Sequence, residues 1–142
     1  MVSVLLVEDN ETDIFVIRKA LEKCAFATTL EVFRNGEAAV DHIRTLAADG
    51  NRPCPTLLLL DLNVPRVPGI EVLRELRNAT RCSDTWVIVV TSSDSRGDRD
   101  SVQKLGANAY FRKPSDLHAY LGLSGVIDNV LSGAPDASGS VQ

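Results

Sequence analysis

The chain has 142 residues and a formal net charge of −4 at pH 7, which together suggest one domain with a substantial core. Its lysines and arginines are scattered, so we expect no nucleic-acid-binding surface. Its apolar stretches are too short to span a bilayer, so we expect no membrane segment.

The first half of the chain alternates strands with helices. The apolar run over residues 2–7 predicts a buried strand, and a helix opened by Asn10 or Glu11 is expected next. Residues 28–33 alternate weakly and predict a second strand. The Asn35-Gly36 pair predicts a turn, and a second helix is expected after it from its apolar stripe.

The second half continues the alternation. The four leucines of residues 57–60 predict a strand buried on both faces, because the run is apolar without a break. A third helix is expected over residues 70–77, and the apolar run over residues 86–90 predicts a fourth strand. A short fourth helix is expected within residues 94–104, with Gly106 at its carboxyl end.

The last elements complete a simple pattern. Residues 109–111 predict a fifth strand, and a last helix capped by Ser115-Asp116 is expected to run to about Leu131. Residues 132–142 are rich in Ser, Gly, Ala, Pro and Asp, so we expect a disordered tail. Five strand–helix units predict one α/β domain over residues 1–131, with a doubly wound, five-stranded parallel sheet and five helices.

Polar side chains follow four of the five predicted strands. Glu8 and Asp9 follow the first strand, Asp61 the third, Thr91 the fourth and Lys113 the fifth. The carboxyl ends of parallel strands meet at one edge of the sheet, so these side chains should converge. Three carboxylates repel one another unless a cation neutralises them, which favours a bound Mg²⁺ ion. The set suits a phosphoryl group held on an aspartate nucleophile, Asp61.

This conjunction of residues resembles the response-regulator receiver domains, and the resemblance covers about residues 3–131. It implies a flavodoxin-like sheet with the strand order 2-1-3-4-5. It also implies that Asp61 is the phosphoacceptor. Asp9 and Asp61 would bind Mg²⁺ directly, Glu8 would bind it through water, and Asn63 would bind it through its backbone carbonyl.

The same resemblance implies a conformational switch. The phosphoryl group would come from a phosphohistidine on a sensor histidine kinase. Lys113 would contact the phosphate, and the Thr91 hydroxyl would move toward it. Tyr110 would then turn inward, and the surface of helix four, strand five and helix five would change. Pro114 is expected to follow Lys113 through a cis peptide bond.

Further features resemble the stand-alone regulators associated with bacterial phytochromes. These are the long segment over residues 47–56, the Asp-Leu-Asn-Val-Pro turn at residues 61–65 and the lack of an output domain. The resemblance implies a bacteriophytochrome kinase as partner and a homodimer through the helix four–strand five–helix five surface. Pro68 is a departure, because Asp or Asn is commoner in the family before the glycine.

Two other functions are compatible with an aspartate at the end of a buried strand. A phosphatase of the haloacid-dehalogenase type needs a second aspartate two residues later, where this chain has Asn63. A nucleotide- or flavin-binding domain needs a glycine-rich turn after the first strand, where Asp9-Asn10-Glu11 would repel phosphate. We therefore expect a phosphoacceptor that is no enzyme beyond slow self-catalysed phosphorylation and dephosphorylation.

The cysteines and the first residues of the chain indicate the cellular compartment in which the protein is expected. Cys24, Cys54 and Cys82 are odd in number and follow no metal-binding spacing, so free thiols in a reducing cytoplasm are expected. Residues 1–9 lack the basic start and long apolar core of a signal peptide, which also favours the cytoplasm. His42 is expected to be a structural or surface residue.

Overall fold

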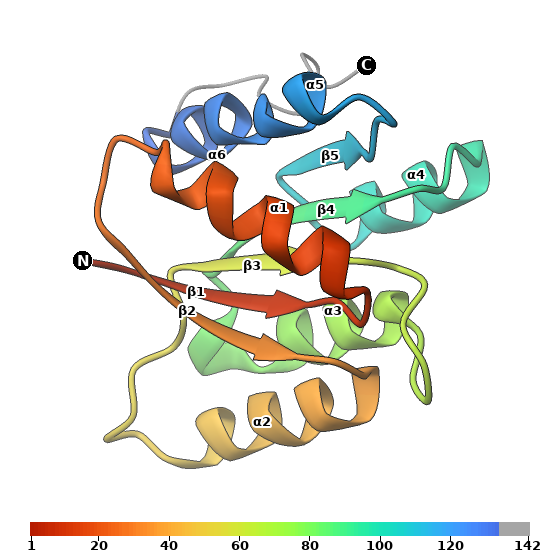
Figure 1. Ribbon diagram of the computed structural model, residues 1–142. Helices are drawn as coiled ribbons and strands as arrows, with labels where there is room; N and C mark the ends of the chain where they lie inside the picture. The colour runs from red at the N-terminus through yellow and green to blue at the C-terminus, as the bar shows by residue number, and fades with distance from the viewer. Residues whose placement is uncertain (134–142) are drawn as a thin grey trace.

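The computed structural model describes residues 1–133. Its parallel sheet has the order β2-β1-β3-β4-β5, which confirms the predicted fold. All five strand arrows point the same way, so their carboxyl ends share one edge (Figure 1). The strands are β1 (Val2–Val7), β2 (Thr28–Phe33), β3 (Leu57–Leu60), β4 (Trp86–Thr91) and β5 (Ala109–Arg112).

Helices cover both faces of this sheet (Figure 1). One face carries α1 (Glu11–Glu22), α5 (Leu117–Leu121) and α6 (Leu123–Leu131). The other face carries α2 (Gly36–Ala48), α3 (Gly69–Asn78) and α4 (Arg96–Lys104). A short 3-10 helix, η1 (Thr80–Cys82), links α3 to β4 and was not predicted. None of the helices among residues 1–133 is long and apolar enough to cross a membrane.

The leucines of β3 join the two hydrophobic cores. Leu57 and Leu59 pack into the core beneath α1, α5 and α6, whereas Leu58 and Leu60 pack into the core beneath α2 and α3. All four are 0% exposed, as expected for successive side chains of a strand that is covered on both faces. Burial of each contributes about 1.5–3 kcal/mol, which fixes β3 and thus the position of Asp61 after it.

Local capping signals explain where several helices begin. The Asn10 side chain accepts a hydrogen bond from the Asp13 amide at 2.9 Å and starts α1. Asn35 accepts one from the Ala38 amide at 2.8 Å, so the pair predicted to form a turn opens α2 instead. Asp116 caps α5 as predicted, through the Ala119 amide at 2.8 Å.

The last predicted helix is divided in two at Gly122, between α5 and α6. Glycine has the greatest backbone freedom and a poor helix propensity, which accounts for the break there. Gly106 adopts the left-handed conformation (φ +81°) after α4, as the predicted carboxyl-terminal glycine should. Ser132 closes α6, and residues 134–142 of the predicted tail lie outside the described residues.

Arg77 holds the loops at the amino ends of β4 and β5. Its half-buried guanidinium uses all five N–H groups, on the carbonyls of Leu105, Ser83, Thr85 and Gly106 and on Asn108 Oδ1. Burial lowers the pKa of Arg77, and the charge of Asp84 partly opposes that shift. These bonds fix the two strands whose other ends carry Thr91 and Lys113.

Candidate functional site

Carboxylates from two neighbouring strands converge at the carboxyl edge of the sheet, as predicted. One carboxylate oxygen from each of Glu8, Asp9 and Asp61 lies within 4.8 Å of the other two. Glu8 and Asp61 are buried, at 1% and 5% exposure, while Asp9 is exposed to solvent. Backbone pairing produces the approach, because the Asp61 amide donates to the Val7 carbonyl at 3.0 Å.

Lys113 reaches into this cluster from the end of β5. Its Nζ lies 2.8 Å from Glu8 Oε1, 2.8 Å from Asp13 Oδ2 and 2.9 Å from Asp61 Oδ2. Burial lowers the pKa of Lys113, but the contacts of its ammonium group with Asp13, Glu8 and Asp61 outweigh this effect, and the net pKa is raised. The ammonium group therefore stays charged through the physiological range.

Asp13 and Tyr120 belong to the cluster, although the sequence analysis did not select them. Asp13 lies in the first turn of α1 and accepts from Lys113 through Oδ2. Its Oδ1 accepts from the Tyr120 hydroxyl of α5 at 2.9 Å. Burial, and then the bond to Asp13, raise the pKa of Tyr120. The sequence did contain one indication of the role of Asp13. Asn10, as the capping residue, starts α1 directly after β1 and so places the first turn of this helix, with Asp13, at the same edge of the sheet.

Glu8 has an unusual ionisation. Burial raises its pKa to about 7, and the charge of Asp61 adds to this shift, while Lys113 opposes it. Glu8 Oε2 accepts from the Asn10 amide at 3.1 Å. Its Oε1 pairs with Lys113 at 2.8 Å as an ion pair without well-directed hydrogen-bond geometry. That buried oxygen retains the capacity to accept a further donor or to face a cation.

The donor set fits a hard divalent cation. Magnesium prefers carboxylate and carbonyl oxygens together with water, and the cluster offers oxygens of Glu8, Asp9 and Asp61 within 4.8 Å of one another. Glu8 Oε1 accepts no hydrogen bond and Asp9 is exposed, so both have acceptor capacity for a cation or for its bound water. Asn63 lies beside the cluster, because its amide donates to Asp61 Oδ1 at 3.1 Å.

The loop after Asp61 is held close to the start of α3. The Gly69 amide donates to the Leu62 carbonyl at 3.0 Å. A Cβ atom on Gly69 would lie only 2.3 Å from the Asp61 carbonyl oxygen, so this position requires glycine. Pro68 precedes α3 without a side-chain cap, which is the structural consequence of proline at a position where the family commonly has Asp or Asn.

Thr91 and Tyr110 are joined through Ser93. Thr91 is fully buried, and its Oγ1 accepts from the Ser93 amide at 3.4 Å. The Tyr110 hydroxyl donates to the Ser93 carbonyl at 2.8 Å, and the Arg99 guanidinium lies 4.3 Å from the centre of the Tyr110 ring. Tyr110 is 5% exposed, so its ring already points inward in this structure. Burial raises its pKa.

Two sequence predictions were wrong, one beside the site and one at the opposite edge of the sheet. All peptide bonds between described residues are trans, including the bond before Pro114. The trans form of such bonds is favoured by about 0.5–1 kcal/mol unless the surroundings select cis. Cys54 and Cys82 form a disulfide and are not free thiols, whereas Cys24 is free. Their Cα atoms lie 5.4 Å apart because β3 and β4 are neighbours whose starts lie side by side.

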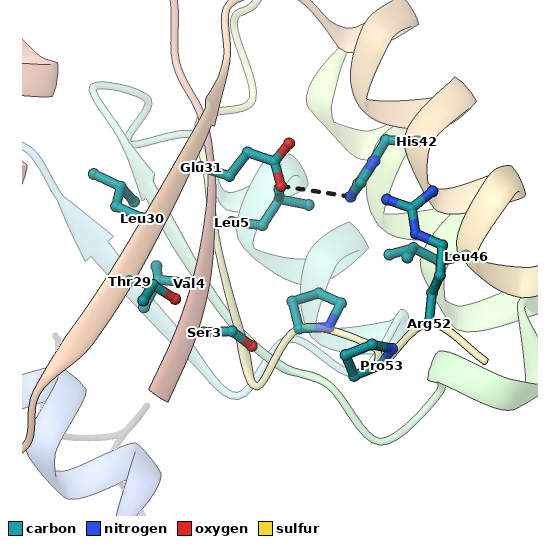
Figure 2. A pocket seen from close by; sticks show the side chains of 11 residues that line it. Ser3, Val4, Leu5, Thr29, Leu30, Glu31, His42, Leu46, Arg52 and Pro53 are labelled. Atoms are coloured by element: carbon teal, nitrogen blue, oxygen red, sulfur yellow. Dashed lines mark ion pairs between the residues drawn. The ribbon is translucent and has the colours of Figure 1, made fainter. Parts of the chain in front are cut away.

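A separate hollow of about 340 Å³ lies away from the carboxylate cluster (Figure 2). It is bounded by β1, β2, α2 and the loop before β3. Figure 2 shows His42 pointing at Glu31, with Nε2 3.8 Å from the Glu31 carboxylate. His42 also packs against Phe33, with ring centres 4.8 Å apart, so it is a structural residue as predicted.

Magnesium affinity is expected to rise about tenfold between pH 6 and pH 8. Glu8 has a folded-state pKa of about 7, above its ordinary 4.5, and its proton competes with the cation across that window. In the metal-free protein the same shift makes stability fall as pH rises from about 4.5 to about 7. Calorimetric titration with Mg²⁺ at several pH values measures the affinity. The Glu8→Gln variant should show a flatter profile, and an equally steep one would contradict this origin.

The comparisons with known proteins agree on one family. The sequence model of the response regulator receiver domain matches residues 4–121. The probable methanogenesis regulatory protein FilR2 of Methanothrix harundinacea (strain 6Ac) is 38% identical over 111 residues, covering 78% of this chain and 71% of that protein. Response regulator Rcp1 of Synechocystis sp. (strain ATCC 27184 / PCC 6803 / Kazusa) is 32% identical over 114 residues, covering 80% and 78%.

Solved structures give the same result. The Mn²⁺-bound form of Rcp1 has a TM-score of 0.80 at 29% identity, covering 91% of this chain and 93% of that one. The phosphorylated cyanobacterial phytochrome response regulator RcpA has a TM-score of 0.81 at 29% identity, covering 92% and 93%. The chain belongs to the response regulator receiver domain family, whose members are phosphoacceptor signalling proteins and not enzymes.

Proposed function

We propose that Asp61 accepts a phosphoryl group from the phosphohistidine of a sensor kinase, with Mg²⁺ bound by the neighbouring oxygens. Glu8, Asp9, Asp61 and the backbone carbonyl of Asn63 would hold the ion. The observation that carries the proposal is the cluster itself. Three carboxylates lie within 4.8 Å of one another, and the Lys113 ammonium lies 2.9 Å from the proposed nucleophile.

The side chains at the site suit an in-line transfer. A carboxylate oxygen of Asp61 forms the new bond to phosphorus while the bond between phosphorus and the histidine nitrogen breaks. Lys113 offsets negative charge on the phosphoryl oxygens. Asp13 accepts from its ammonium group and is itself held by the Tyr120 hydroxyl. When bound, the metal ion would supply further positive charge at those oxygens.

Thr91 would carry the signal from the phosphoryl group. In the described conformation its hydroxyl oxygen accepts from Ser93, whose carbonyl holds the Tyr110 hydroxyl. A shift of Thr91 toward a phosphoryl oxygen would release this loop and change its bond to Tyr110. The α4–β5–α5 surface would then present a different face to a partner or to a second copy of the chain.

The partner we propose is a phytochrome-type sensor kinase in the cytoplasm. RcpA, which shares the fold at a TM-score of 0.81, is described as a cyanobacterial phytochrome response regulator. Two further neighbours, AtBRR and RtBRR, are bacteriophytochrome response regulators, at 33% and 29% identity. A homodimer would use the α4–β5–α5 surface. The receiver domain would span residues 1–131.

Beryllofluoride binding tests this function. It mimics an acyl phosphate on aspartate, so calorimetry should detect binding to the wild-type protein when Mg²⁺ is present and none in its absence. Turnover of a small phosphate monoester would instead support a phosphatase, and binding of a flavin without Mg²⁺ would support a flavin-binding domain. Co-purification of a sensor kinase, compared with and without beryllofluoride, would then identify the partner.

A further inference from the structure

A second open hollow, of about 180 Å³, lies at the amino ends of β3 and β4. It is therefore at the opposite edge of the sheet from the carboxylate cluster. Both disulfide-bonded cysteines, Cys54 and Cys82, line it together with Arg81, Asp84 and Trp86. The hollow gives a small molecule access to the disulfide from solvent.

The two cysteines differ in exposure. Cys82 is 1% exposed, because it ends η1 and packs into the core beneath α2 and α3. Cys54 lies in the loop before β3 and is partly exposed. A reagent that enters the hollow therefore meets Cys54 first, and Cys82 is placed behind it as the resolving partner.

A fixed cation contacts the accessible sulfur. The Arg81 guanidinium lies 3.3 Å from Cys54 Sγ, and its other terminal nitrogen donates to the Arg52 carbonyl. A positive charge beside a cysteine favours the thiolate, which is the nucleophile in thiol–disulfide exchange. Asp84 carries the opposite charge in the same hollow, but the contact with the sulfur is made by Arg81.

The protein holds the two segments together without the disulfide. Thr85 Oγ1 donates to the Pro55 carbonyl at 2.8 Å, and the Trp86 amide donates to the Thr56 carbonyl at 3.0 Å. These bonds join the loop that carries Cys54 to the residues that follow η1, close to both cysteines. When the disulfide is open, the two sulfurs therefore remain neighbours, and the bond can form again.

We propose that Cys54 and Cys82 form a thiol–disulfide exchange site for low-molecular-weight thiols and disulfides. In the oxidising direction, the Cys54 thiolate attacks one sulfur of a small disulfide, and the other half leaves as a thiolate. Cys82 loses its proton to solvent and attacks Cys54 Sγ, which closes the protein disulfide and expels the second small thiolate. Two protein thiols are oxidised, and one small disulfide is reduced to two thiols.

The setting proposed for this domain makes such a site significant. Glutathione keeps most cytoplasmic thiols reduced, and the disulfides that form there are usually transient or redox-sensing. A disulfide with one accessible sulfur beside a cation has the features of an exchangeable bond. The inference stands independently of phosphoryl transfer, because it uses none of the residues at the other edge.

Trapping with glutathione tests the order of the two cysteines. The reduced Cys82→Ser variant, treated with oxidised glutathione, should form a mixed disulfide at Cys54, located by peptide mass spectrometry. The Cys54→Ser variant should form little at Cys82. Cys24 is the internal reference in both, since burial raises its pKa to about 11 and keeps it unreactive. Modification of Cys24 or Cys82 at the rate of Cys54 would overturn the proposal.

Replacement of the cation tests the mechanism. In the Cys82→Ser background, Arg81→Gln should slow glutathione capture by Cys54 about threefold at pH 7, because the thiolate loses its stabilising charge. Arg52→Gln is the matched control: it removes one positive charge from the loop that carries Cys54 but leaves the backbone carbonyl that Arg81 contacts. Equal rates in the two arginine variants, with far-ultraviolet circular dichroism unchanged, would remove Arg81 from the mechanism. Failure of the reduced wild type to close with oxidised glutathione would overturn the exchange site.

Discussion

Asp61→Asn is expected to abolish phosphoryl incorporation from a small acyl-phosphate donor such as acetyl phosphate. The amide oxygen is a poor nucleophile, so the bond to phosphorus cannot form at this position. The fold should survive, because the asparagine side chain keeps the size of the aspartate and its one carbonyl oxygen can still accept from either the Asn63 amide or Lys113. Intact-protein mass spectrometry in the presence of Mg²⁺ measures the incorporation.

The control for this experiment is Asp100→Asn. Asp100 is an exposed aspartate of α4 that lies outside the carboxylate cluster, so its variant should be labelled like the wild type. Asp61→Asn should also lose Mg²⁺-dependent beryllofluoride binding. Undiminished labelling of Asp61→Asn would remove Asp61 from the role of phosphoacceptor and would point to another carboxylate of the cluster.

The positions of the central strands could be predicted from the sequence because these strands are nearly continuous apolar runs. Four leucines without a polar interruption can be buried on both faces only in a central strand, and β3 matches residues 57–60. Periodicity also placed β1 and β2. Residue type indicated helix starts at Asn10 or Glu11 and at Ser115-Asp116, and the structure uses Asn10 and Asp116 as the caps. Once the strands were parallel, the positions of Glu8, Asp61 and Lys113 at strand ends followed from topology alone.

The features that the sequence did not predict depend on contacts between distant segments. Tyr120 lies on a largely apolar helix, and only packing of α5 against α1 brings its hydroxyl to Asp13. The cysteines of the disulfide are separated by 28 residues, and no local pattern pairs them. The helix break at Gly122 was not predicted, because the apolar spacing on either side of it fits one continuous helix.

Charge balance explains why Lys113 is central to the site. Its ammonium group contacts Glu8, Asp13 and Asp61, and Asp9 lies within the same carboxylate cluster. Protonation of Glu8, whose pKa is raised to about 7, relieves part of this negative charge. Phosphoryl transfer would bring further negative charge to the same place. The lysine and a divalent cation would therefore both offset the negative charge of the cluster. If either is lost, the stability of the cluster should depend more strongly on the other.

Lys113→Met is expected to lower the unfolding free energy at pH 8 by about 3 kcal/mol and to slow phosphoryl labelling about 100-fold. The first effect arises because buried carboxylates lose their partner, and the second because a positive group at the phosphoryl oxygens is removed. Millimolar Mg²⁺ should restore part of the stability by offsetting the charge of the remaining carboxylates, and acidification to about pH 5 should do so by protonating Glu8, whose pKa is about 7. Urea unfolding with and without Mg²⁺ measures the first effect, and time-resolved labelling measures the second.

Two further variants separate the charge of Lys113 from its placement. Lys104→Met removes an exposed lysine at the end of α4, away from the cluster, and should match the wild type in both measurements. Asp13→Asn keeps an oxygen that can accept from Lys113 or Tyr120 but removes one negative charge. Its labelling rate should therefore fall less than that of Lys113→Met, with little loss of stability. Wild-type stability and labelling in Lys113→Met would show that the carboxylates at this edge do not depend on the ammonium group, because that variant removes the charge and its hydrogen bonds together.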